Sequence, residues 1–192
     1  YWETMNNNEL LVFTDRWLCY KARLGEFAET KASLLGDYLP AKLGMEDGER
    51  VIYACLSGDY SGNMLFFFRN GKVAKVPLQS YATASNRRKL TGAYCDKFPL
   101  CACLFLPEDR EVALYTDEPR LLLMHTSSLT PKPTRSTQGV AVMTIKPKYH
   151  LERVAFPEDT GITHHSRYRT RTLPAAGALL KPEDSDEKQL EL

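Results

Sequence analysis

The 192-residue sequence has no long hydrophobic run. None approaches the ~20 apolar residues that a transmembrane helix needs. The chain also does not begin with the basic and then apolar stretch of a signal peptide. It begins at Tyr1 rather than at Met, and we expect it to be a fragment of a longer protein. Its 43% hydrophobic and 26% charged residues fit a soluble protein with a packed core.

The sequence also lacks the motifs of common catalytic and cofactor sites. It has no G-x-x-x-x-G-K loop that would hold the phosphates of ATP. No Ser/His/Asp or Cys/His arrangement lies in a recognisable context. We therefore expect no cofactor and no catalytic residue, and a small hydrolase on a β scaffold is disfavoured.

The five cysteines have no disulfide-framework spacing, and each lies in an apolar or strand-like context. This fits reduced thiols in the core of a cytoplasmic protein. Cys101 and Cys103 are expected to point to one face of a strand. Zinc requires about four ligands, and no second close pair of Cys or His is present, so we favour core cysteines over a metal site.

Charge is spread unevenly along the chain, although the formal net charge is only +1. Residues 1–62 hold 6 basic and 10 acidic side chains, residues 63–154 hold 14 and 7, and residues 155–192 hold 5 and 7. The basic middle suggests an anionic partner, and the acidic end suggests a competitor for the same surface.

A repeat runs through the sequence. With an offset of 54 residues, "LVFTDRWLCYKARLGEF" from Leu11 matches "LFFFRNGKVAKVPLQSY" from Leu65 without a gap. Phe13 matches Phe67 and Lys21 matches Lys75. A fainter third copy is "ALYTDEPRLLLMHTSSL". A repeat of about 50 residues indicates a propeller or a stacked array.

Each unit has the same succession of predicted elements. An apolar strand (residues 10–14, 64–68 and 112–116) leads through a tight turn to a second strand (18–22, 72–76 and 120–124). The Asn70-Gly71 pair predicts a turn in which both residues have positive φ. Polar stretches follow (28–36, 82–92 and 130–139), and each ends at a Gly after which apolar character returns in "DYLPAKL", "AYCDKF" and "VAVMTIK". Apolar strands close the units (50–56, 99–106 and 150–156).

This succession gives about four strands per unit, the content of a propeller blade. The predicted fold class is all-β, with three to four blades in a ring that is open or closed. We expect residues 1–157 to form this domain, with blades at 9–62, 63–110 and 111–157. Residues 158–192 are expected to form a linker and an acidic tail whose last ten or so residues are loosely docked or disordered.

The second unit reads "FFRNGKVAKVPLQSY" and the first reads "FTDRWLCYKARLGEF". From about Glu9 to Val154 the chain resembles the C-terminal domain of the strand-cutting subunit of the bacterial type IIA topoisomerases, DNA gyrase and topoisomerase IV. The resemblance implies a β-pinwheel, in which each blade lends a strand to its neighbour and duplex DNA wraps around the outer rim. It implies a non-catalytic domain whose partners are duplex DNA, the remaining domains of the strand-cutting subunit and the ATPase subunit, in the bacterial cytoplasm at the nucleoid.

The chain departs from that family at two places. Trp17 and Pro119 occupy the turn position that Gly71 has in the second unit. The stretch "SNRRKLTG" from Ser85 is basic but lacks the glycine run of the gyrase wrapping loop, which favours topoisomerase IV or a weakly wrapping paralogue.

Arg87, Arg88 and Lys89 are the leading candidates for contact with DNA phosphates, because basic side chains in a loop between strands reach outward. The alternative is a solvated surface turn. The corresponding loops carry Lys31 in the first unit and Lys132 and Arg135 in the third. The second-rank candidates, for which a solvated strand face is an equal alternative, are Lys72, Lys75, Lys146 and Lys148.

The tail offers two further features. His164 and His165, with Arg167, Arg169 and Arg171, contact phosphate or belong to a solvated linker. The acidic stretch after Pro182 competes with DNA or only aids solubility. For the whole chain, the rival function is a propeller-like domain that docks a peptide or a partner subunit.

Overall fold

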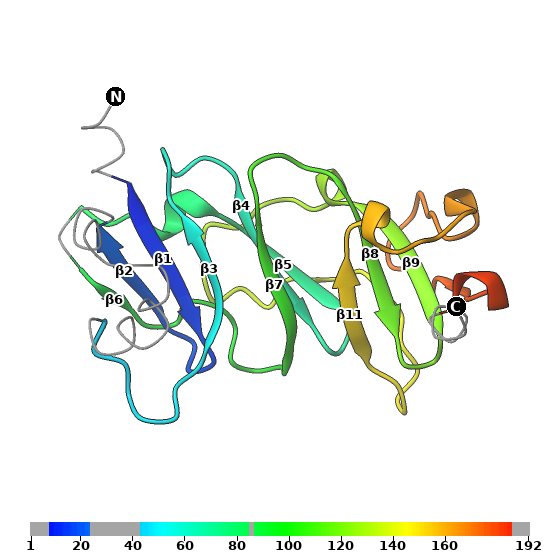
Figure 1. Cartoon of the computed structure of the whole chain (residues 1–192), viewed down its shortest axis with the longest axis horizontal. Coiled ribbons are helices and arrows are strands. Elements are labelled where there is room, and N and C mark those ends of the chain that lie inside the picture. The colour runs from blue at the N-terminus through cyan, green and yellow to red at the C-terminus, as the bar shows by residue number, and fades with distance from the viewer. Residues whose placement is uncertain (1–7, 24–42, 85–86, 186–192) are drawn as a thin grey trace.

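The computed structural model describes residues 8–23, 43–84 and 87–185. They form three four-stranded antiparallel sheets that stand side by side along the longest axis of the molecule (Figure 1). This confirms the predicted all-β class. None of the helices in these ranges is long and apolar enough to cross a membrane.

Each sheet is built from one repeat unit and one borrowed strand. The strand orders are β3-β1-β2-β6, β10-β5-β4-β7 and β11-β8-β9-β12. The first sheet consists of β1 (Glu9–Thr14), β2 (Cys19–Arg23), β3 (Val51–Leu56) and β6 (Lys89–Leu90). The second consists of β4 (Asn63–Phe68), β5 (Lys72–Pro77), β7 (Leu100–Leu106) and β10 (Val140–Ala141). The third consists of β8 (Glu111–Thr116), β9 (Arg120–His125), β11 (Leu151–Ala155) and β12 (Ala178–Leu179).

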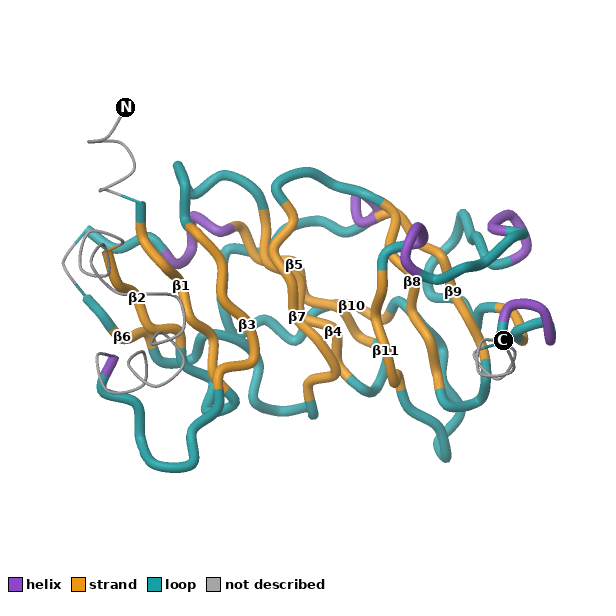
Figure 2. Tube along the Cα trace, viewed as in Figure 1, coloured by secondary structure: helices purple, strands orange, loops and turns teal. Residues whose placement is uncertain are grey.

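The borrowed strands β6, β10 and β12 each come from the segment that follows the unit they complete. They lie at one edge of their sheets, which we call the outer edge. The opposite, inner edge is formed by β3, β7 and β11, and β7 contacts both of the others (Figure 2).

The apolar run of β4 is explained by burial on both faces. Met64, Phe66 and Phe68 pack toward the first sheet, and Leu65 and Phe67 pack toward the third. Because side chains alternate along a strand, a strand between two sheets must be apolar at every position. The three consecutive phenylalanines are the result.

A bulge interrupts each inner strand. The register of β7 against β4 shifts between Phe67, which faces Ala102, and Phe68, which faces Leu100. Cys101 is therefore the extra residue, and a bulge turns the following side chains to the other face. Cys101 packs against the second core cluster and Cys103 against the first, so the prediction that both thiols share one face is wrong.

The hairpin turn of the second unit also differs from expectation. Gly71 has φ 87°, and its amide donates to the carbonyl of Phe68 at 3.0 Å. Asn70 is not among the residues with positive φ, so only one of the two predicted positions has it. In the first unit Trp17 takes the glycine position with φ 58°.

The segment after residue 157 packs against the third sheet over its described part. Strand β12 pairs with β9, and Tyr168 and Ile162 cover Leu121 and Leu123. The short 3-10 helix η6 (Pro182–Asp184) follows, with Asp184 buried beneath the hydroxyl of Tyr168 at 2.6 Å. These contacts make residues 158–185 part of the third layer rather than a free linker.

Candidate nucleic-acid interface

Arg87, Arg88 and Lys89 lie exposed at the outer edge of the first sheet. Lys89 belongs to β6 and pairs with Tyr20 of β2, and the backbone amide of Lys21 donates to the carbonyl of Arg88 at 2.8 Å. The predicted loop is therefore partly a strand. Backbone pairing holds Arg88 and Lys89 at this edge, and all three side chains are exposed to solvent.

A carboxylate lies beneath this basic segment. Glu49 is buried and accepts hydrogen bonds from Thr14 at 2.7 Å and from Tyr20 at 3.0 Å. Burial raises the pKa of Glu49, but these hydrogen bonds, the Glu46 amide and the nearby Lys89 outweigh it, so the pKa lies below its usual range. Burial and the bond to Glu49 raise the pKa of Tyr20 to about 12. The Lys89 ammonium lies 5.9 Å from the Tyr20 ring.

Lys132 and Arg135 occupy the corresponding outer edge of the second sheet. The amide of Lys132 donates to the carbonyl of Lys75 at 2.8 Å, and the Lys132 side chain is exposed. Arg135 is half-buried and donates to the carbonyls of Ser80 at 3.1 Å and Thr91 at 3.3 Å. Since Thr91 follows β6 closely, Arg135 bridges the basic segments of two neighbouring sheets.

Lys75 does not reach the surface. It is 5% exposed, and its ammonium lies 2.9 Å from Asp109 and 3.1 Å from the carbonyls of Thr126 and Leu129. The hydrogen bond from Lys75 holds the pKa of Asp109 below its usual range. Strand alternation predicts a solvent-facing lysine, but the lysine lies beneath the chain that crosses between sheets. An ammonium enclosed in this way cannot contact phosphate.

The other candidates that the structure describes do not belong to the outer strands, although Lys72 of β5 pairs with Ala141 of β10. Lys72 is half-buried with its ammonium 5.0 Å from the Phe98 ring. Lys146 binds Glu118 in a hairpin turn at 2.9 Å, and Lys148 is exposed nearby in the chain. Lys31 lies outside the described residues.

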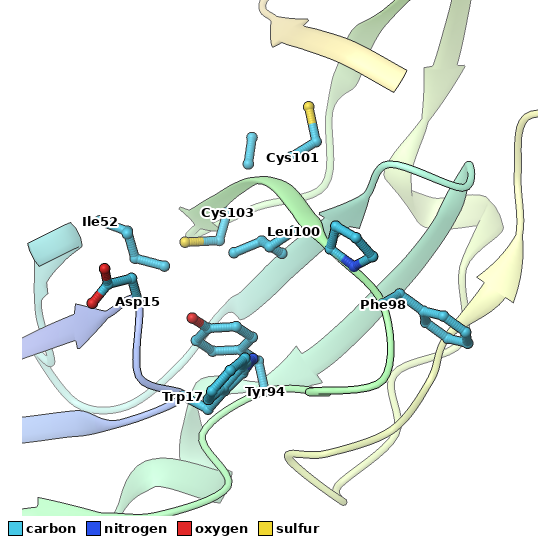
Figure 3. A pocket seen from close by; sticks show the side chains of 10 residues that line it. Asp15, Trp17, Ile52, Tyr94, Phe98, Leu100, Cys101 and Cys103 are labelled. Atoms are coloured by element: carbon cyan, nitrogen blue, oxygen red, sulfur yellow. The ribbon is translucent and has the colours of Figure 1, made fainter. Parts of the chain in front are cut away.

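A concave site of different character lies between the first and second sheets. A cleft of about 300 Å³ is lined by Trp17, Ile52, Tyr94 and residues of β7, with Asp15 at its side (Figure 3). Tyr94 is fixed by a 2.7 Å hydrogen bond to the carbonyl of Thr14. Trp17 is 41% exposed. This cleft is mostly apolar and suits a side chain of a partner better than it suits a phosphate.

Within the described residues no group of three or more His, Cys, Asp or Glu side chains could hold a metal ion. Burial raises the pKa of the Cys103 thiol to about 12, and the thiol of Cys55 adds to the shift. Such a thiol is a poor metal ligand because the ligand is the thiolate.

Three solved structures have a similar fold. The C-terminal domain of DNA gyrase A matches with a TM-score of 0.58 and 13% identity, over 94% of this chain and 64% of that chain. The C-terminal domain of DNA topoisomerase IV matches with a TM-score of 0.64 and 19% identity, over 81% of this chain and 49% of that chain. The E. coli ParC C-terminal domain matches with a TM-score of 0.64 and 12% identity, over 92% of this chain and 78% of that chain.

This chain has the β-pinwheel fold. It spans about two thirds of the matched gyrase domain and half of the matched topoisomerase IV domain. No family model and no curated protein matches the sequence. At these identities the likeness concerns the fold, and the function has to be argued from the site.

Proposed function

We propose that this chain is a non-catalytic domain of a type II DNA topoisomerase, and that it holds duplex DNA along the outer edges of its sheets. The observation that carries the proposal is the exposed segment Arg87-Arg88-Lys89, fixed on an outer edge by the pairing of β6 with β2. Lys132 and Arg135 continue the basic surface at the next sheet. The fold and the excess of basic over acidic side chains in residues 63–154 support the same conclusion.

The physical role of such a surface is to neutralise phosphates without reading sequence. Each contact releases condensed counterions, so affinity falls steeply as salt rises. Contacts spread over successive sheets offset the cost of bending the duplex. The domain would then present one DNA segment to cleavage domains elsewhere in the strand-cutting subunit, which works with a separate ATPase subunit.

The test is binding of the chain to a labelled duplex of about 40 base pairs across a salt series. Neutralising one phosphate contributes about 0.9 to the slope of log affinity against log salt. Arg87→Ala/Arg88→Ala/Lys89→Ala should therefore lower the slope by about 2 to 3. A matched control removes three positive charges at the hairpin-turn ends of the sheets: Arg16→Ala/Arg50→Ala/Arg69→Ala.

An equal loss of slope in the control would contradict the placement of DNA on the outer edges. Absence of binding even at low salt would remove the DNA-holding function. The rival, a domain that docks a peptide or another subunit of an assembly, is favoured by the apolar cleft around Trp17. Docking of that kind would depend little on salt and would be lost on Trp17→Ala.

A further inference from the structure

The segment that follows the third sheet repeats the path of the two basic segments. Lys21, Lys75 and Leu123 occupy equivalent positions in β2, β5 and β9, opposite Leu11, Leu65 and Ala113. Each is joined at 2.8 Å to a backbone group of the chain on its outer side. The partners are the Arg88 carbonyl, the Lys132 amide and the Tyr168 carbonyl.

Two glycines show that the equivalence extends along the segment. Gly139 and Gly177 precede the borrowed strands β10 and β12 and have φ 73° and 74°. A Cβ at Gly139 would lie 2.3 Å from the Val73 carbonyl oxygen, and one at Gly177 would lie 2.6 Å from that of Leu121. Since Val73 and Leu121 are equivalent strand positions, residues 168–179 enter the third sheet as a further repeat unit would.

Residues 167–171, at the start of this segment, carry three exposed arginines at alternate positions. Arg169 forms a two-pronged contact with Glu111 at 2.8 and 3.0 Å, yet its side chain is 51% exposed. Arg167 donates to the carbonyl of Leu179 at 3.1 Å. Arg171 is exposed. A guanidinium has five N–H donors, so these contacts hold Arg167 and Arg169 in place and leave donors for a second acceptor.

We propose that Arg167, Arg169 and Arg171 form a third phosphate-binding segment, so that bound duplex DNA runs across the outer edges of all three sheets. This inference rests on the proposed function and extends it to a part of the chain for which the sequence allows either phosphate contact or a solvated linker. The alternative is that the arginines only secure the segment to Glu111 and Leu179.

The experiment uses the full chain, the same 40-base-pair duplex and the same salt series. Arg167→Ala/Arg171→Ala should lower the slope of log affinity against log salt by about 1.8, two contacts at about 0.9 each. Arg167→Lys/Arg171→Lys keeps both charges and should retain most of the slope. The matched control, Arg110→Ala/Arg153→Ala, removes two arginines from the inner side of the same sheet and should leave the slope unchanged.

Circular dichroism and urea unfolding of each variant establish that the third sheet is intact. An unchanged slope in the folded Arg167/Arg171 variant, with a reduced slope for Arg87/Arg88/Lys89, would overturn this inference and leave the proposed function standing. Loss of binding in wild type would overturn both. Equal losses in the variant and in the inner-side control would also contradict a third segment.

Discussion

Two lysines that look alike in the sequence as surface charges are internal. Lys21 and Lys75 are 3% and 5% exposed and occupy the same strand position in successive units. Lys75 is enclosed by Asp109 and two backbone carbonyls, and Lys21 donates to Thr83 at 2.9 Å with Glu9 at 3.8 Å. Each ammonium therefore binds the chain of the following unit to its own sheet. In the third unit Leu123 has this position and packs on Tyr168 instead.

Replacing Lys75 by methionine should destabilise the fold. Lys75→Met keeps the length of the side chain but leaves the carbonyls of Thr126 and Leu129 without their donor. We expect the free energy of unfolding in urea to fall by about 2 kcal/mol, less than for a fully buried pair because Asp109 is partly exposed. Lys72→Met, on the same strand, should change it by less than about 1 kcal/mol. Equal effects of the two variants would contradict a structural role for Lys75.

At the scale of elements, the sequence predicts the three long strands of each unit to within about one residue at each end. Alternation and turn residues are strong local signals, and β4 is recognisable from its apolar run. The borrowed strands are not predictable as strands, since two residues carry no periodicity. The bulge at Cys101 cannot be predicted either, because one extra residue in a strand does not change the local composition.

The same reasoning explains which part of the site is predictable. The exposure of Arg87, Arg88 and Lys89 is predictable, because three adjacent charges in a polar stretch are seldom all buried. The burial of Lys75 cannot be predicted in this way, because its partners lie 34 to 54 residues further along the chain. Much of the repeated motif serves the core: Leu78 and Tyr81 are fully buried, and the Tyr81 hydroxyl donates to the Ala93 carbonyl at 2.7 Å.

The pairing of β12 with β9 in the third sheet depends on one glycine, Gly177. Gly177→Ala places a methyl group 2.6 Å from the Leu121 carbonyl oxygen at a positive φ. We expect a loss of about 3 kcal/mol in the free energy of unfolding and faster amide exchange at Leu180, which donates to Pro119. Gly44→Ala is the matched control, with φ 70° but open space around the new methyl, and should lose about 1 kcal/mol. Similar losses of unfolding free energy in the Gly177 and Gly44 variants would show that the close approach to the Leu121 carbonyl does not contribute to stability.

At the scale of the whole molecule, the three sheets depend on one another through shared faces. The outward face of the third sheet, with Leu121 and Leu123, is covered only by the segment that contains Ile162 and Tyr168, within the residues that the structure describes. A chain that stops at residue 157 would expose this face.

We therefore expect truncation after Pro157 to lower the free energy of unfolding by about 4 kcal/mol, the scale of burying two large side chains. Tyr168→Phe in the full chain keeps the ring and loses only the hydrogen bond to Asp184, so its loss should be about 1 kcal/mol. Urea titration and size-exclusion chromatography would measure both. An unchanged unfolding midpoint for the truncated chain would contradict the layered assignment of residues 158–185.

The borrowed strands also impose an order on biosynthesis. A nascent chain emerges from the ribosome from its N-terminus, but the first sheet needs β6 from the second unit, and the second sheet needs β10 from the third. Each of these two sheets therefore remains incomplete until the following unit has been translated. The third sheet is completed only when β12, which follows the third unit, has been made. Co-translational folding of these three sheets thus runs one unit behind synthesis.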